Sequence, residues 1–220
     1  MSETELLLWV RGPALQIATV IFLLGVVVRL GEILVLGRKK NLAEARGSAV
    51  AGGLRTILSR TIPDRGTLQR STFNIVAGYL FHIGFFVVLF FFAPHILVFQ
   101  DVLGVSWPSL PTPVVDATAV VTMIALLAVL VHRLQHPVMR FLSRFQDYLV
   151  WLVTILPVVT GYLAFHRVDV VPPPTLLAVH ILSVELLMVI FPFTKLMHAF
   201  TLFMARYYNG AISGYRGVNS

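Results

Sequence analysis

Residues 174–200 read PTLLAVHILSVELLMVIFPFTKLMHAF, and this stretch decides what kind of protein the chain forms. Between Pro174 and Thr194 the only formal charge belongs to Glu185. About 20 mostly apolar residues are enough for a helix to cross the hydrocarbon layer of a bilayer. We therefore predict a transmembrane helix from Pro174 to Tyr208, whose last turns extend beyond the hydrocarbon.

The rest of the chain has the same apolar character. Hydrophobic residues make up 57% of the sequence and charged residues 12%, about half the charged share of a soluble domain. The sequence thus predicts an all-α integral membrane bundle of about five transmembrane helices, with residues 1–220 as one membrane domain. The other four helices are predicted at Pro13–Leu36, Ser71–Phe99, Val114–Leu134 and Asp147–Phe165.

The basic residues indicate the orientation of the helices. The net charge of +7 comes mainly from a few loops, and lysine and arginine favour the cytoplasmic side. We therefore predict an outer N-terminus, a cytoplasmic C-terminus and multiple passes through the inner (plasma) membrane, with no nucleic-acid partner. The basic cytoplasmic loop at 38–70 could form a surface helix that docks a cytoplasmic partner, or could bind anionic lipid. Its basic residues are Arg38, Lys39, Lys40, Arg46, Arg55, Arg60, Arg65 and Arg70.

Histidines are the candidate metal ligands. The chain has no cysteine and seven histidines, which excludes disulfides, thiolate metal sites and iron–sulfur clusters bound by this chain. His132, His136 and His166 fall near predicted helix ends, where interfacial polar roles are expected. An ionisable group within a membrane span is energetically expensive and suggests function. The histidines predicted inside spans are His82, His95, His180 and His198.

The spacing of these four histidines predicts two pairs at different depths. His180 and His198 are 18 residues apart, about five helical turns, so both leave one face and differ by ~27 Å along the axis. His82 and His95 lie on an antiparallel helix. His82 should therefore meet His198 near the cytoplasm, and His95 should meet His180 near the outside. Two such pairs suit two six-coordinate haems stacked across a bilayer.

The register of His95 leaves alternatives open. His82 and His95 are 13 residues apart, about 220° of rotation on a straight helix, so they would not share a face. Pro94 could bend or unwind that turn. Otherwise His95 is an interfacial histidine at the helix end. The alternative for the other three is a hydrogen bond between helices.

Two segments carry a family resemblance that covers most of the chain. They are Phe81-His82-Ile83-Gly84 and the segment from His180 to Phe191-Pro192-Phe193-Thr194-Lys195-Leu196-Met197-His198. With the five-helix layout, they resemble the gamma (cytochrome b) subunit of respiratory nitrate reductases and related complexes. The resemblance implies two haems b, with His82 and His198 on the inner haem and His180 on the outer one. The family's second histidine of this helix would fall at Phe92, and His95 comes about one turn later. Either the register has shifted and His95 is the fourth ligand, or the outer haem is bound differently or is absent.

The resemblance also implies a function. The family passes electrons between membrane quinol or quinone and a cytoplasmic iron–sulfur subunit of a respiratory oxidoreductase, and substrate chemistry belongs to that partner. We expect quinol to bind at the outer end, near His95 and the loop before Val114. Candidate partners for the haem propionates are Arg167 and Trp107 outside, and Lys195, Arg70 and Arg133 inside.

Other functions remain possible from sequence alone. A haem-free membrane anchor would need no histidines at matched depths. A small transporter would favour repeats and paired broken helices, whereas the only internal break of this kind is at 157–161. An intramembrane hydrolase would need a carboxylate beside a pair such as His132 and His136. Arg29 and Glu32, three residues apart, are expected to pair with each other.

Overall fold

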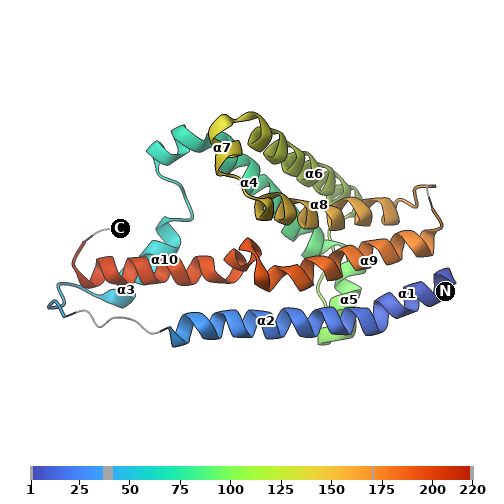
Figure 1. The fold of residues 1–220 in the computed structure, drawn as a ribbon, viewed down its shortest axis with the longest axis horizontal. Helices are drawn as coiled ribbons and strands as arrows, with labels where there is room; N and C mark the ends of the chain where they lie inside the picture. The colour runs from blue at the N-terminus through green and yellow to red at the C-terminus, as the bar shows by residue number, and fades with distance from the viewer. Residues whose placement is uncertain (1, 37–41, 170, 219–220) are drawn as a thin grey trace. The chain divides into compact units, whose positions relative to one another are not determined.

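The computed structural model describes residues 2–36, 42–169 and 171–218, and Figure 1 shows the order of its helices. Arg38, Lys39 and Lys40 of the predicted basic loop lie outside the described residues. The described ranges contain no β-strand, only an isolated bridge between Asp169 and Val171. The α-helices of these ranges are α1 (Glu3–Trp9), α2 (Leu15–Val35), α3 (Ala49–Ser59), α4 (Arg65–Phe91), α5 (Ala93–Leu103), α6 (Thr112–Gln135), α7 (Pro137–Leu142), α8 (Phe145–Phe165), α9 (Pro173–Ile190) and α10 (His198–Tyr215).

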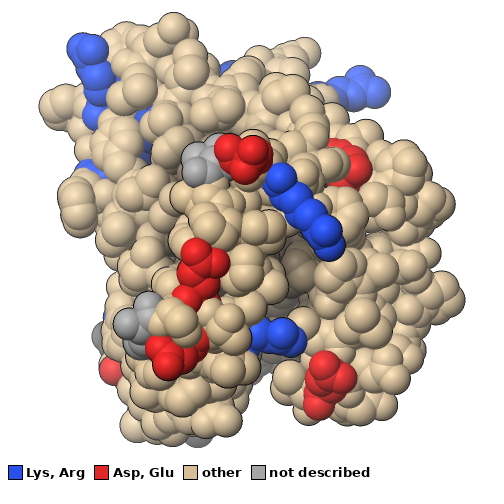
Figure 2. Space-filling model, turned by 90° about the vertical axis from the view of Figure 1, so that its right-hand side faces the viewer, with Lys and Arg blue, Asp and Glu red and all other residues tan. Residues whose placement is uncertain are grey.

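Five helical segments of the described chain are long and apolar enough to cross a membrane. Large apolar side chains are exposed on the surfaces of these segments: Leu24 on α2 is 61% exposed and Ile124 on α6 is 59% exposed. Figure 2 shows the end of the molecule that lies at the right in Figure 1, where separate acidic and basic side chains are scattered among uncharged residues. The prediction of an all-α multi-pass membrane protein is therefore confirmed. The five segments are Glu3–Val35, Arg65–Phe91, Thr112–Gln135, Phe145–Phe165 and Pro173–Phe193.

The first predicted helix is longer than expected. Helical structure begins at Glu3, and a π-helical turn over Val10–Ala14 joins α1 to α2. Ser2 starts this helix, because its hydroxyl accepts a hydrogen bond from the Glu5 amide and the Glu5 carboxylate bonds back to the Ser2 amide. This reciprocal arrangement satisfies two donors that would otherwise lack partners at a helix start.

The second predicted helix is divided in two. It was expected to continue to Phe99, but α4 ends at Phe91 and α5 begins at Ala93. Phe92 between them has φ −81° and ψ 125°, an extended conformation. Pro94 sits in the first turn of α5 and has no amide hydrogen for a continuous helix, so the chain changes direction before it.

The last predicted helix is also interrupted. α9 ends at Ile190, and two 3₁₀ turns at Phe191–Phe193 and Lys195–Met197 precede α10. Thr194 between these turns is extended, with φ −130° and ψ −179°. Pro192 causes the interruption, because a proline inside a helix removes one hydrogen bond and clashes with the preceding turn.

Contacts divide the chain into two compact units, one of 1–19 with 73–189 and one of 20–72 with 190–220. We call them the first and the second unit. The boundaries pass through α2, α4 and α9, so the division leaves the single-domain prediction untested. In the first unit, Leu126 of α6 packs with Ile155 and Val158 of α8. Phe81 and Phe85 of α4 cover this cluster, which joins three membrane helices.

In the second unit, α3 lies along α10 (Figure 1). The predicted surface helix of the basic loop is therefore present, and it contacts the end of the chain. Small residues allow the two backbones to approach closely, as at helix interfaces in membranes. A Cβ atom on Gly52 would lie 2.7 Å from the Gly214 Cα, and one on Gly53 would lie 2.6 Å from the Tyr207 ring.

Candidate functional site

His95 and His180 lie together in the first unit. Their ring centroids are 6.2 Å apart and their ring planes differ by 19°. His95 is in the first turn of α5 and His180 is in the middle of α9, so the pair joins segments that are far apart in the sequence. The expected juxtaposition of these two residues is therefore present.

The break between α4 and α5 at Phe92 determines where the His95 side chain lies. Because α5 starts afresh after this residue, the rotation expected along one straight helix does not apply. The Nδ1 atom of His95 lies 3.0 Å from the carbonyl oxygen of Val88, in the last turns of α4. A carbonyl can only accept, so Nδ1–H is the donor. This hydrogen bond fixes the direction of the ring across the break.

α8 positions the other ring. The Nδ1 atom of His180 lies 3.3 Å from the hydroxyl oxygen of Thr160, which donates its own hydrogen to the Leu156 carbonyl. The hydroxyl oxygen therefore accepts from Nδ1–H. The next residue, Gly161, faces the same ring: a Cβ atom there would lie 2.9 Å from the His180 Cε1. Sequence reasoning noted this stretch of α8 only as a break and missed its contact with His180.

All four predicted ligands share this hydrogen-bonding pattern. The Nδ1 of His82 lies 2.6 Å from the Gly78 carbonyl oxygen, and that of His198 lies 2.8 Å from the Lys195 carbonyl oxygen. When Nδ1–H donates, the neutral imidazole carries its lone pair on Nε2. Metal-bound histidines almost always donate their other ring N–H in this way. This tautomer is the one that the predicted ligand role of the four side chains requires.

The dimensions of the His95–His180 pair fit an iron between two imidazoles. Metal–imidazole bonds of about 2 Å, with about 1 Å from each nitrogen to its ring centre, bring the two centroids to roughly 6 Å. The observed 6.2 Å matches this span. The described residues contain no group of three or more histidine, cysteine or acidic side chains that could hold a metal ion. Axial ligation of haem requires only two protein ligands.

His82 and His198 belong to different units, and each is described within its own. His82 is on α4 and its ring contacts Phe81 at 4.5 Å between centroids. His198 is the first residue of α10, directly after the two 3₁₀ turns. Their pairing stays a prediction.

The remaining histidines have structural roles. The Nδ1 of His136 accepts from the Met139 amide at 3.4 Å and caps α7. Its lone pair is therefore on Nδ1, whereas in the four candidates it is on Nε2. The His132 ring packs against Phe73, with centroids 4.4 Å apart. The Nε2 of His166 lies 3.4 Å from Asp116 Oδ1, an ion pair when the histidine is protonated. These contacts agree with the expected interfacial roles.

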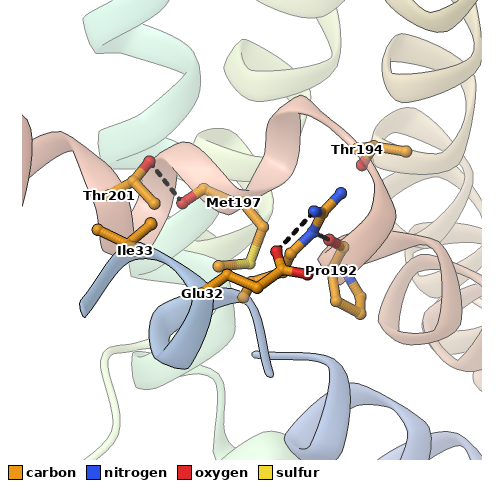
Figure 3. Close-up of a pocket in the computed structure, with 7 residues that line it drawn as sticks. Glu32, Ile33, Pro192, Thr194, Met197 and Thr201 are labelled. Carbon is orange, nitrogen blue, oxygen red and sulfur yellow. Dashed lines mark hydrogen bonds and ion pairs between the residues drawn. The ribbon is translucent and has the colours of Figure 1, made fainter. Parts of the chain in front are cut away.

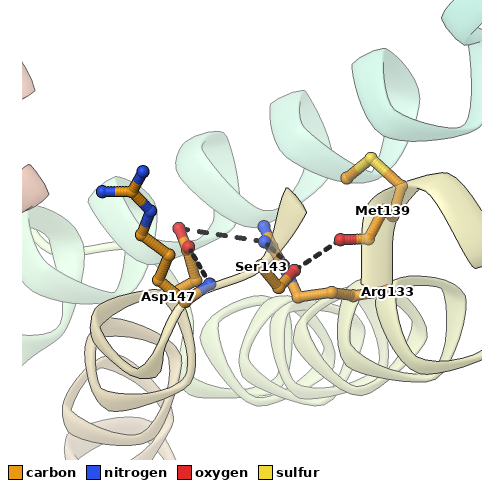
Figure 4. A network of polar contacts seen from close by, with 5 residues as sticks. Arg133, Met139, Ser143 and Asp147 are labelled. Atoms are coloured by element: carbon orange, nitrogen blue, oxygen red, sulfur yellow. Dashed lines mark hydrogen bonds and ion pairs between the residues drawn. The ribbon is translucent and has the colours of Figure 1, made fainter. Parts of the chain in front are cut away.

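One of the candidate propionate partners is already engaged. The indole N–H of Trp107 donates to the Phe90 carbonyl at 2.6 Å, and an indole has no second donor. Arg133 donates to the Ser143 hydroxyl at 2.9 Å and lies 3.8 Å from Asp147 Oδ1 (Figure 4). Trp107 therefore has no donor left for a propionate, and the role of Arg133 stays a prediction.

The other three candidates keep that role as a prediction. Arg167 follows α8 with φ 48°, an uncommon left-handed conformation for a residue with a side chain. Lys195 lies in the second 3₁₀ turn, and its carbonyl oxygen accepts from His198. Arg70 donates through Nε to the Gly66 carbonyl at 3.1 Å, which occupies one of its five donors.

An aromatic pocket of about 600 Å³ lies in the first unit, beside the break that carries His95. Phe90, Phe91, Trp107 and Pro108 line it. Phe92, the next residue along the chain, contacts the His95 ring at 5.2 Å between centroids. Two phenylalanines at the end of α4 therefore form part of the wall of this pocket.

Glu185, one turn after His180 on α9, is only 6% exposed. Its Oε1 atom has no hydrogen-bond partner among the residues that the structure describes. A buried carboxyl oxygen without a partner is costly, and more so in a membrane span. No hydrogen bond within the described part of the chain offsets the cost of burying this oxygen.

Comparison with known proteins identifies a relative of this chain. A protein of Nitratidesulfovibrio vulgaris (strain Hildenborough), described only as "Protein", is 36% identical to this chain over 138 residues. The match covers 63% of this chain and 60% of the relative, so the chain spans about three fifths of the relative's length. No protein-family model and no solved structure matches the chain.

Proposed function

We propose that the chain is a dihaem cytochrome b subunit that carries electrons between membrane quinol or quinone and a cytoplasmic iron–sulfur subunit of a respiratory complex. His95 and His180 hold one haem through their Nε2 atoms, and His82 and His198 hold the other. Haem iron with two such ligands takes up and releases single electrons without changing its ligands.

The observation that carries this proposal is the His95–His180 pair itself. Two imidazoles at 6.2 Å, each with Nδ1–H directed to an acceptor, have the separation and the tautomer that iron ligation needs. Two histidines that merely bonded each other between helices would bring a ring nitrogen of each to within about 3 Å, with one as donor and one as acceptor. Here both Nδ1 atoms bond elsewhere.

The aromatic pocket beside His95 is the proposed quinol site. Its lining of Phe90, Phe91, Trp107 and Pro108 suits a planar apolar ring. Phe92, next to this wall in the sequence, packs edge-on against the His95 imidazole. With the N-terminus outside, as the basic loops predict, quinol oxidised here releases its two protons to the outer side of the plasma membrane.

The paired α3 and α10 are the proposed docking surface for the cytoplasmic subunit. The Tyr215 hydroxyl donates to the Ala43 carbonyl at 2.6 Å, and the Arg46 amide donates to the Tyr215 carbonyl at 2.8 Å. These bonds hold the otherwise irregular chain before α3 against α10. Arg46, Arg55, Arg60, Arg206 and Arg216 give the pair its positive charge.

Histidine replacements test the assignment. The complex is purified with its native partners from cells that express His95→Ala, His180→Ala, His82→Ala or His198→Ala, and its reduced-minus-oxidised spectrum is recorded. Each variant is expected to lose one of two b-type haem signals, the same signal for both members of a pair. His136→Ala is the matched control and should keep both. Retention of both signals in His180→Ala would refute the site, and a colourless wild-type protein would favour a haem-free anchor.

A further inference from the structure

A second pocket lies within the second unit, where α2 packs against the interruption that follows α9. Its volume is about 220 Å³, and Figure 3 shows its lining around Glu32, Pro192 and Thr194. We call it the Arg29 pocket. The residues used in the argument are Arg29, Glu32, Pro192, Thr194, Met197 and Thr201.

The helix interruption creates this pocket. A Cβ atom on Gly25 would overlap the ring of Pro192, so only a glycine lets α2 approach the interrupted segment so closely. Phe22 of α2 packs edge-on against Phe191, with centroids 5.2 Å apart. Because the backbone at Pro192 is no longer α-helical, its carbonyl oxygen is free to bond a side chain: it accepts from Arg29 Nε at 3.2 Å.

The pocket contains a positively charged hydrogen-bond donor, Arg29, and a negatively charged acceptor, Glu32. Arg29 Nη1 lies 2.9 Å from Glu32 Oε2, which confirms the expected pair. The two side chains are 48% and 52% exposed, so the pair lies at the open entrance of the pocket and is not enclosed by the protein. Arginine has five N–H donors, and the bonds to the Pro192 carbonyl and to Glu32 use two of them. Ionised groups on a membrane helix are costly and point to function.

We propose that the Arg29 pocket binds the headgroup of a lipid-soluble quinone, separately from the aromatic pocket near His95. A guanidinium N–H donates to a quinone carbonyl oxygen, and the Glu32 carboxylate accepts from the hydroxyl of the reduced form. Pockets that enclose a whole drug-sized ligand measure about 300–1,000 Å³. A space of about 220 Å³ therefore takes the ring system alone, with the isoprenoid tail left in the lipid.

The charges favour a quinone over a lipid phosphate. A phosphate requires net positive charge, whereas the Glu32 carboxylate, 2.9 Å from Arg29 Nη1, already neutralises this charge and would repel an anion. A quinone headgroup is neutral and needs one donor and one acceptor. Thr194 and Thr201 add hydroxyl oxygens to the lining, and Met197 adds a flexible apolar wall that adapts to a ring.

Photolabelling tests this proposal without relying on haem or on turnover. The complex in lipid nanodiscs is illuminated with an azido-naphthoquinone, and labelled peptides are identified by mass spectrometry. We expect label in the peptide containing 194–201, removed by excess menaquinone-4 and unaffected by phosphatidylglycerol. Arg29→Gln should weaken this labelling about tenfold, the effect of losing one charged hydrogen bond. Arg11→Gln removes an exposed arginine elsewhere and should leave it unchanged.

Thr201→Leu provides a second test, because it adds bulk to the pocket and leaves the Arg29–Glu32 pair in place. It should also abolish labelling, while thermal melting and the haem absorbance stay as in the wild type. Three results would each overturn the proposal: label confined to the peptide containing 90–108, labelling unchanged in both variants, or displacement by phosphatidylglycerol alone. The haem spectrum of the same samples tests the proposed function independently, since a colourless protein can still be labelled.

Discussion

The centroids of the imidazole rings of His95 and His180 lie 6.2 Å apart and the ring planes are nearly parallel, although the two membrane helices α6 and α8 separate the residues in the sequence. The Val88 carbonyl orients one ring and the Thr160 hydroxyl orients the other. Neither ring donates to its neighbour through Nδ1. The distance between the ring centroids equals the span expected for the proposed ligation of one iron by both rings.

Gly161 should be essential for the placement of His180. A side chain there would begin 2.9 Å from the imidazole Cε1, closer than real contacts allow. Gly161→Val is expected to displace the ring and remove one of the two haem signals in the reduced-minus-oxidised spectrum. Gly31→Val is the control, because no described atom lies within 4 Å of a Cβ at Gly31. Two intact haem signals in Gly161→Val would show that this ring does not bind iron.

Thr160 should tune the haem that His180 binds. Its hydroxyl oxygen accepts from the imidazole Nδ1–H, and such bonds raise the basicity of a ligating histidine. Thr160→Val keeps the shape and removes the acceptor, so ferric iron loses stabilisation. The midpoint potential of that haem should rise by about 20–50 mV, the equivalent of roughly one neutral hydrogen bond. Potentiometric titration measures the shift, and the other haem serves as the internal control.

Gly52 should be essential for the contact between α3 and α10. A Cβ atom there would meet the Gly210 carbonyl and lie 2.7 Å from the Gly214 Cα, so the backbones would have to separate. Gly52→Val should destabilise this contact by about 1–3 kcal/mol. Hydrogen exchange of residues 49–59 should accelerate, and partner binding should weaken. Ala51→Val, on the exposed side of α3, should change neither.

Asp64 gives the start of α4 a dependence on pH. Hydrogen bonds from the Thr67 hydroxyl and amide, at 2.5 and 3.0 Å, lower the pKa of the Asp64 carboxyl from its usual 3.8. The ionised form is thus favoured in the folded chain, and its stabilisation is complete above that usual value. It is lost as the pH falls through the lowered pKa. Exchange of the Thr67 amide, corrected for its intrinsic rate, should therefore accelerate at low pH, and Asp64→Ala should accelerate it at neutral pH. Equal protection in the variant would contradict this role.

The membrane helices could be predicted because length and apolarity decide them locally. The predicted helix at Asp147–Phe165 differs from α8, Phe145–Phe165, by two residues at one end. The two interruptions were less predictable. Pro94 and Pro192 are visible in the sequence, but the direction taken by the chain after each depends on what packs there. For Pro192 the neighbour is Gly25, which is remote in the sequence.

The contact between His95 and His180 could be predicted from the sequence, whereas the groups around it could not. Depth alone paired His95 with His180, since antiparallel helices bring matched levels together. The groups that orient the rings were not foreseen, because Val88 is selected by the break at Phe92 and Thr160 by the contact of α8 with α9. The same limitation applies to α3, whose glycines find partners only after the chain has returned from the last membrane span.

The most direct test of the central claim is the haem content of the purified wild-type complex. A pyridine haemochrome assay, corrected for haem in co-purifying subunits, measures b-type haem per copy of this chain. Our account predicts about two haems per chain, with low-spin spectra typical of two histidine ligands. A preparation that contains the intact chain and no haem b would contradict it.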